Sequence, residues 1–213
     1  MAILPTPLSI SIEPMYSNEI FVKDEELVSL YVKERNGKAF EDLCKRYTAL
    51  LYRYSMSFVR NRDDAEDIVQ KTFIKVWKNI HTFDVSKKFS VWIYVIARRT
   101  ALDEIKKKRA FSFSELSGEE NTPFEETLES GLPSIERELQ NLKNVNAFEE
   151  ILKKMDEDKA EILFLKLYED LTFEEIGELT ERPMNTVKSI YRRSLLLVQK
   201  ELVDTYHINA PKE

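Results

Sequence analysis

Scarcity of glycine limits the fold of this chain more than any other feature. Only four glycines occur in 213 residues. β-Hairpin turns and phosphate-binding loops depend on glycine, because their backbones adopt conformations that residues with a side chain resist. The sequence also lacks the sustained alternation of apolar and polar residues that is typical of a half-buried strand. We therefore predict an all-α fold.

Helical periodicity and its interruptions divide the chain into two blocks. Residues 110–133 contain two of the four glycines, two prolines and many serines and threonines, without a helical period. This composition predicts a flexible linker between two small helical domains. Helices are expected at about 24–34, 38–60, 63–80 and 89–108, and then at about 134–154, 157–169, 172–180 and 184–204. The predicted segments are a flexible N-terminal arm (1–22), a first domain (23–109), the linker (110–133), a second domain (134–206) and a tail (207–213).

Charge is distributed unevenly along the sequence. The net charge is −6, which by itself counts against a nucleic-acid partner. Residues 96–109, however, hold six basic and two acidic side chains, and residues 182–200 hold five basic side chains and no acidic one. The segment 110–138 is strongly acidic, with eight glutamates against one arginine. Each predicted domain therefore carries one basic helix, and an acidic linker joins the two.

Composition also limits the cellular compartment and the kinds of chemistry that we expect of this chain. A single cysteine, Cys44, cannot form an internal disulfide, which fits a reducing compartment. No apolar run approaches the length of about 18 residues that a membrane span needs, and the N-terminal sequence lacks the basic start of a signal peptide. We expect a soluble, cytoplasmic protein without membrane insertion. The two histidines, His81 and His207, lie far apart and no glycine-rich loop occurs, so no enzyme activity, cofactor or metal site is expected.

The segment DDAEDIVQKTFIKVW (63–77) predicts a helix with two different faces. An apolar stripe on one face is predicted to pack into a core. Its members are Ala65, Val69, Phe73, Val76 and Ile80. The opposite face presents Asp67, Gln70 and Ile74 at spacings of three and four. An outward isoleucine among charged residues is either a stray surface residue or part of a contact with a partner, and geometry alone leaves both interpretations open.

The sequence LTFEEIGELTERPMNTVKSIYRRSLLLVQKEL has the spacing of a helix-turn-helix. Thr172 and Glu175 are expected to cap a short helix together, and a tight turn leads to a longer helix capped by Asn185 or a nearby turn residue. The longer helix is predicted to turn Val187, Tyr191, Ser194, Val198 and Leu202 inward, and Asn185, Lys188, Ser189 and Arg192 outward. The N-terminal end of a recognition helix reads the major groove, although two such helices also occur as a plain packing unit.

Three segments occur in order: DDAEDIVQKTFIKVW, FSVWIYVIARRTALDEIKKKR and, beyond the acidic linker, FEEIGELTERPMNTVKSIYRRSL. Together they resemble the extracytoplasmic-function (ECF, group IV) RNA polymerase sigma factors of the sigma-70 family, and the likeness covers roughly residues 24–204. The resemblance implies a bacterial transcription initiation factor. Such a factor binds core RNA polymerase, recognises the minus-ten and minus-thirty-five promoter elements and promotes DNA opening. The first domain would be sigma-2-like and the second sigma-4-like.

The resemblance also implies which residues form three contact surfaces. The polymerase-binding residues, which dock on the β′ coiled coil, are Asp64, Asp67, Gln70, Ile74 and Trp77. The minus-ten residues are Phe83, Lys87, Lys88, Arg98, Arg99, Asp103, Lys106 and Lys107. The minus-thirty-five residues are Asn185, Thr186, Lys188, Ser189, Arg192 and Arg193. The implied partners are core polymerase, through the β′ coiled coil and the β flap, and promoter DNA; an anti-sigma factor is a further partner that the resemblance allows.

Some positions depart from the family pattern or need a separate interpretation. Arg99 stands where members commonly have an Asn that helps to hold the flipped minus-ten base, so the base preference is left open. Ile190 replaces a common Arg on the recognition helix, near the core edge, which predicts a lost phosphate contact. Arg99 and Asp103 are expected to form an intrahelical ion pair, and Trp92 is expected to pack in the core. The competing interpretations are a stand-alone helix-turn-helix repressor and a sigma-like adaptor that does not open DNA.

Overall fold

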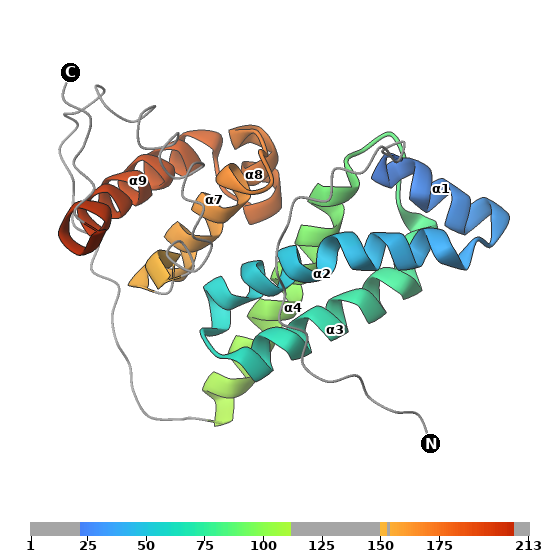
Figure 1. The fold of residues 1–213 in the computed structure, drawn as a ribbon, viewed down its shortest axis with the longest axis horizontal. Coiled ribbons are helices and arrows are strands. Elements are labelled where there is room, and N and C mark those ends of the chain that lie inside the picture. The colour runs from blue at the N-terminus through green and yellow to red at the C-terminus, as the bar shows by residue number, and fades with distance from the viewer. Residues whose placement is uncertain (1–21, 112–149, 153, 207–213) are drawn as a thin grey trace.

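The computed structural model describes residues 22–111, 150–152 and 154–206 of the chain. Within these ranges all regular elements are helical, so the all-α prediction is confirmed (Figure 1). The elements are α1 (Asp24–Glu34), α2 (Gly37–Val59), α3 (Arg62–Asn79), the short 3-10 helix η1 (Ile80–Thr82), α4 (Phe89–Phe111), α7 (Glu157–Leu167), α8 (Phe173–Thr180) and α9 (Met184–Tyr206). The predicted N-terminal arm apart from Val22, most of the predicted linker and the tail lie outside the described residues.

Most helix boundaries agree with the predicted ones, and local capping explains several of them. Asn36 caps α2 by accepting a hydrogen bond from the Lys38 N–H at 3.1 Å, and Asn61 caps α3 by accepting one from the Asp64 N–H at 2.9 Å. α4 continues to Phe111, beyond the predicted end at residue 108. Of the helix predicted at 134–154, residues 150–152 and 154 are described, and all four are helical.

The first domain comprises α1 to α4 and is centred on α2, which packs against α1, α3 and α4 (Figure 1). Leu51 and Tyr54 of α2 and Ile93 and Tyr94 of α4 are buried in its core. The edge of the Tyr54 ring faces the Tyr94 ring, with centroids 4.9 Å apart, an arrangement that the charge distribution of aromatic rings favours. The basic helix α4 is therefore anchored to the core by aromatic packing along one side.

The buried face of α3 is wider than predicted. Four members of the predicted stripe are buried, namely Ala65, Val69, Val76 and Ile80. Phe73 is only partly buried, whereas Ile68 and Thr72, which lie outside the predicted stripe, are buried as well. α3 packs against both α2 and α4, and a helix covered on two sides buries more than one narrow stripe.

The second domain, α7 to α9, contains the predicted helix-turn-helix in α8 and α9. The capping box at the start of α8 is confirmed: Thr172 accepts a hydrogen bond from the Glu175 N–H, and the Glu175 carboxylate accepts one from the Thr172 N–H at 2.8 Å. Of the two caps predicted for α9, Asn185 is wrong, because the helix already begins at Met184, and the alternative of a nearby turn residue is left. The Val187 N–H donates to the carbonyl of Pro183 at 3.1 Å, so the turn residue Pro183 leads directly into the helix.

Gly177 lies where α8 comes closest to the turn before α9. A Cβ atom at this position would lie 2.8 Å from the carbonyl oxygen of Arg182, closer than such contacts occur. We expect Gly177→Ala to lower the free energy of unfolding by about 1–3 kcal/mol, because backbone atoms must shift to make room. Thermal melting checks this, with Gly37→Ala as the control, since a Cβ atom at Gly37 meets nothing within 4 Å. An unchanged Tm for Gly177→Ala would contradict the close approach.

The two domains are packed against each other in this structure. α2 contacts α7 and α4 contacts α8. The centroid of the Phe164 ring on α7 lies 5.6 Å from that of Tyr54 and 6.2 Å from that of Tyr94, so all three rings belong to one apolar cluster. No feature of the sequence predicts this contact. It brings α8 beside the basic helix α4.

Candidate polymerase and promoter interfaces

The outward face of α3 carries an exposed apolar pair. Ile74 is 52% exposed and Trp77 is 56% exposed. These residues are three apart on the helix, and Gln70, also exposed, precedes Ile74 by one turn. Large aromatic and aliphatic side chains surrounded by polar residues are typical of the centre of a protein interface. This arrangement suits a protein partner better than it suits DNA.

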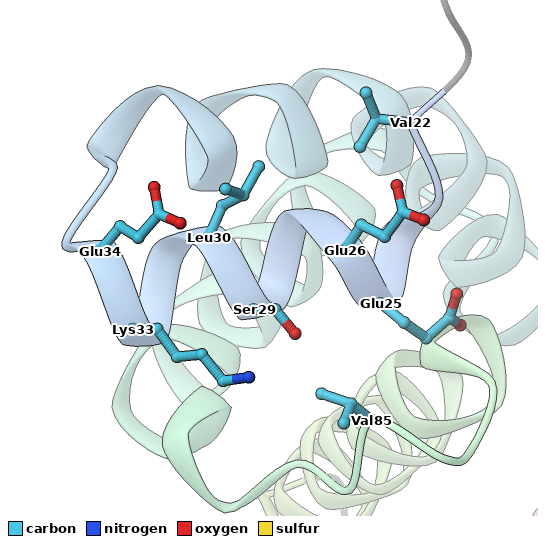
Figure 2. A pocket seen from close by; sticks show the side chains of 8 residues that line it. All are labelled: Val22, Glu25, Glu26, Ser29, Leu30, Lys33, Glu34 and Val85. Atoms are coloured by element: carbon cyan, nitrogen blue, oxygen red, sulfur yellow. The ribbon is translucent and has the colours of Figure 1, made fainter.

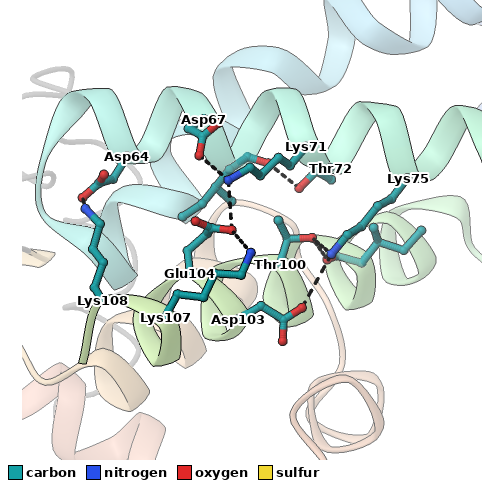
Figure 3. A network of polar contacts seen from close by, with 12 residues as sticks. Asp64, Asp67, Lys71, Thr72, Lys75, Thr100, Asp103, Glu104, Lys107 and Lys108 are labelled. Atoms are coloured by element: carbon teal, nitrogen blue, oxygen red, sulfur yellow. Dashed lines mark hydrogen bonds and ion pairs between the residues drawn. The ribbon is translucent and has the colours of Figure 1, made fainter. Parts of the chain in front are cut away.

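A polar network ties α3 to α4 beside this face (Figure 3). The Lys71 ammonium lies 2.6 Å from the Asp67 carboxylate and 3.0 Å from that of Glu104, and Glu104 also pairs with Lys107 at 3.1 Å. Hydrogen bonds from Lys71 and then Lys107 hold the pKa of Glu104 below its usual value despite partial burial. Asp67 remains exposed while it pairs within its own helix. Its carboxylate is therefore still accessible to a partner, and its docking role stays a prediction.

Two other predicted contact residues, Asp64 and Asp103, also form ion pairs between α3 and α4. Asp64 pairs with Lys108 of α4, which lowers the pKa of the Asp64 carboxyl, and it is only partly exposed (Figure 3). Asp103 pairs with Lys75 of α3 at 3.7 Å. The predicted ion pair between Asp103 and Arg99 is wrong, because Arg99 lies 3.8 Å from Glu181 instead. Carboxylates on α4 are thus partly neutralised by lysines of α3.

The loop before α4 exposes its side chains to solvent, and the aromatic ring at its start is buried beneath it. Residues 84–88 are all exposed, and Lys87 and Lys88 are among them. Phe83 is buried, with its ring centroid 5.5 Å from that of Phe89 and 5.3 Å from that of Trp92. Trp92 is partly buried and packs against the core, as expected. In this conformation Phe83 supports the loop from beneath, and its ring is not open to solvent.

The predicted minus-ten cations of α4 differ in accessibility. Arg99, Lys106 and Lys107 are exposed. The side chain of Arg98 is only 15% exposed, because it pairs with the buried Glu161 of α7 at 3.1 Å. The minus-ten surface of this structure therefore exposes the cations Lys87, Arg99, Lys106 and Lys107. Arg98 is largely buried and does not belong to it.

Helix α9 carries the predicted minus-thirty-five residues in its N-terminal half. Asn185, Thr186, Arg192 and Arg193 are exposed, and Lys188 and Ser189 are partly exposed. The inward prediction is confirmed for Val187, Tyr191, Ser194 and Val198. The side chain of Leu202 lies outside the described residues.

Ile190 is partly buried and packs against the core, as its predicted place near the core edge implies. Nearby, the Lys188 ammonium lies 5.9 Å from the centre of the Phe173 ring, which places the cation over the start of α8. The outward surface of α9 combines cations with hydrogen-bonding side chains, a set that suits phosphates and base edges.

A hollow of about 660 Å³ lies between α1 and the loop before α4 (Figure 2). Its lining includes three carboxylates, Glu25, Glu26 and Glu34, against one cation, Lys33. It contains none of the residues predicted from the sequence to contact DNA or polymerase. This excess of negative charge does not suit a nucleic-acid phosphate. In the part of the chain that the structure describes, no group of three or more His, Cys, Asp or Glu side chains could hold a metal ion. Among the helices described there, none combines the length and the apolar character of a membrane span.

Comparisons with known proteins match both helical units. The family Sigma-70 region 2 matches residues 36–111, and Sigma-70, region 4 matches residues 146–197. The ECF RNA polymerase sigma factor SigW of Bacillus subtilis is 32% identical over 177 residues, which cover 81% of this chain and 94% of that protein. The RNA polymerase sigma-H factor of Pseudomonas aeruginosa is 26% identical over 182 residues, which cover 84% of this chain and 94% of that protein.

Two solved structures share the fold. CnrH, solved in complex with the cytosolic domain of CnrY, aligns with a TM-score of 0.56 and 19% identity over 85% of this chain and 98% of that chain. The sigma factor RpoE, solved with the anti-sigma factor NepR from Bartonella quintana, aligns with a TM-score of 0.55 and 18% identity over 79% of this chain and 99% of that chain.

The chain therefore belongs to the ECF RNA polymerase sigma factors of the sigma-70 family. It is a transcription initiation factor that binds core RNA polymerase and directs it to promoters. Sigma factors are not catalysts in themselves; they supply promoter recognition to the enzyme.

Proposed function

We propose that this protein is a cytoplasmic, group IV sigma factor with three separate binding surfaces. One binds core polymerase, one binds the minus-ten element and one binds the minus-thirty-five element. The outward face of α3, with Asp67, Gln70, Ile74 and Trp77, docks on the β′ coiled coil of core polymerase. The observation that carries this assignment is the exposed pair Ile74 and Trp77 on a helix whose other face is packed into the core. Asp64 lies at the edge of this surface, and it contributes to docking once a contact with polymerase replaces its ion pair with Lys108.

The loop 84–88 and the exposed cations of α4 act on the minus-ten element. Extruding a base from the DNA stack costs a few kcal/mol, which stacking and phosphate contacts must offset. Lys87, Arg99 and Lys106 are exposed and supply positive charge along one side of the first domain. Phe83 is buried beneath the loop, and it supports the base pocket from below. Arg98 joins this surface only when Glu161 releases it.

The N-terminal half of α9 reads the minus-thirty-five element in the major groove, as recognition helices do. Exposed Asn185 and Thr186 can bond base edges, while Arg192 and Arg193 suit phosphates. The second domain also contacts the β flap of the polymerase. The solved structure of RpoE with the anti-sigma factor NepR supports an anti-sigma factor as a further partner of this chain.

Arg99 is expected to strengthen minus-ten binding without selecting the base. A guanidinium only donates hydrogen bonds and is always charged, so it suits phosphates and base planes, whereas an Asn amide both donates and accepts. The test is promoter opening by Arg99→Ala on four templates, each with a different base at the flipped position. We expect a similar loss on all four templates. A loss confined to one base would show that Arg99 reads sequence and would contradict this assignment.

A further inference from the structure

Helix α1 carries no residue that we assign to DNA or to polymerase, yet it contacts the elements on either side of the loop before α4. One of these elements is η1, which leads into the loop, and the other is α4, which follows it. The hollow of Figure 2 lies beside these contacts, lined by Leu30 of α1 and by Val85 of the loop. The hollow keeps the middle of the loop apart from α1, so α1 holds the loop at its ends.

One hydrogen bond fixes the end of the loop where α4 begins. The Oε1 atom of Glu25 on α1 accepts a hydrogen bond at 2.8 Å from the backbone N–H of Phe89, the first residue of α4. The first N–H groups of a helix have no partner within the helix, and a negative charge beside them is favourable. The two residues are 64 apart in the chain, so no local sequence pattern reveals this contact. Glu25 thus caps α4 from another helix.

The backbone of Glu25 is itself held in place, because the residue before it ties α1 to α2. The Asp24 carboxylate accepts hydrogen bonds from the Arg46 guanidinium and from the Tyr47 hydroxyl, both on α2. Tyr47 is buried, and its ring centroid lies 5.5 Å from that of Phe89. The first turn of α1 is therefore anchored on the same aromatic core that carries the start of α4.

Local hydrogen bonds give the loop a defined shape between its ends. The Asp84 carboxylate accepts hydrogen bonds from the Ser86 N–H at 3.0 Å and from the Ser86 hydroxyl at 2.8 Å. The Lys87 N–H donates to the carbonyl of Asp84 at 3.0 Å, and Phe83, just before this turn, is buried. Turns of this kind are stabilised by their own side chains. They set the shape of the loop, whereas Glu25 sets where the loop joins α4.

We propose that Glu25 is a positioning residue for minus-ten recognition: it fixes the junction between the loop and α4, and with it the geometry in which the exposed residues 84–88 meet the extruded base. This inference rests on the proposed minus-ten role of the loop and extends it to a residue that touches no DNA itself. A pocket that distinguishes bases must hold its hydrogen-bonding groups within about 0.5 Å of the productive geometry. Loss of the bond to the Phe89 N–H lets the junction shift, so the pocket then discriminates less well between the right base and the wrong ones.

The test compares three variants on four promoter templates, each with a different base at the flipped minus-ten position. Glu25→Ala removes the hydrogen bond, whereas Glu25→Gln keeps a side-chain oxygen that can accept from the same N–H. Glu26→Ala is the matched control, because Glu26 also lines the hollow and its loss removes the same charge from the next position on α1. The measured quantity is the rate of promoter opening on each template relative to the best one. This ratio does not depend on the fraction of folded protein, and thermal melting confirms folding.

We expect the preference for the best base to fall at least about fivefold in Glu25→Ala and to stay within about twofold of the wild type in Glu25→Gln. It should be unchanged in Glu26→Ala, and all four proteins should bind minus-thirty-five DNA equally. An unchanged preference in folded Glu25→Ala, or a similar loss in Glu26→Ala, would overturn the positioning role and leave the proposed function standing. A wild-type protein that opens all four templates equally would contradict the proposed base pocket itself, and this inference with it.

Discussion

Replacing Ile74 and Trp77 together by alanine is expected to weaken binding to core RNA polymerase by roughly thirtyfold, or about 2 kcal/mol. Both side chains are more than half exposed, so their truncation removes contact area from a partner without opening a cavity in the core. The Tm of the isolated protein should therefore stay close to that of the wild type. Titration of labelled protein with core polymerase, alongside thermal melting, measures both quantities.

The matched control for this variant removes exposed apolar side chains elsewhere. Within the described residues, Val32 on α1 and Leu197 on α9 are two exposed aliphatic residues that we assign to no binding surface. Alanine at both positions should leave polymerase binding unchanged. If the Ile74 and Trp77 variant binds core polymerase as tightly as the control, the outward face of α3 is not the docking surface.

Replacing Lys188, Arg192 and Arg193 by alanine is expected to flatten the salt dependence of binding to upstream promoter DNA. Each phosphate neutralised by a cation contributes about 0.9 to the slope of log K against log salt concentration, so three lost contacts would lower its magnitude by about 2.7. The three residues lie on one outward side of α9, and Arg192 and Arg193 are exposed. Fluorescence anisotropy over a range of salt concentrations gives the slope directly.

The control for this variant removes the same charge from another surface. Lys33, Lys38 and Lys45 on α1 and α2 are exposed and lie in the first domain. Their replacement by alanine should leave the slope on minus-thirty-five DNA close to that of the wild type. A wild-type slope in the α9 variant would show that this face of the helix does not meet DNA.

Periodicity and capping predicted the fold well, because both are local. The alternation of apolar and polar positions placed Val69 and Val76 of α3 in the core, and the pairing of Thr172 with Glu175 located the start of α8. Predictions of helix ends were weaker where no strong stop signal occurs: glycine and proline are absent from residues 89–111, and α4 continues to Phe111. Of the two alternatives for the cap of α9, Asn185 was wrong and a nearby turn residue was left, because proline at position 183 also leads into a helix.

Accessibility at the candidate site could not be predicted in the same way, because it depends on contacts distant in sequence. Arg98 looked like a surface cation in a basic helix, yet it is enclosed by Glu161, which lies 63 residues further along the chain. Asp64 and Lys108 are 44 residues apart and pair across α3 and α4. The expected pair of Arg99 with Asp103 does not form, because Asp103 pairs with Lys75 on α3 and Arg99 pairs with Glu181 on the turn after α8. Helical spacing alone does not reveal these partners. The residues of the three surfaces remain predictions that the variants above test.

Transcription by core RNA polymerase with and without this protein tests most directly whether the protein starts transcription at promoters. Transcripts from cells that overproduce the protein identify candidate promoters, and purified components then start transcription on those templates. We expect transcripts that begin at defined positions, require the protein, and disappear when either the minus-ten or the minus-thirty-five element is scrambled. Binding to the promoter without any protein-dependent transcript or DNA opening, as a repressor or an adaptor would give, would contradict it.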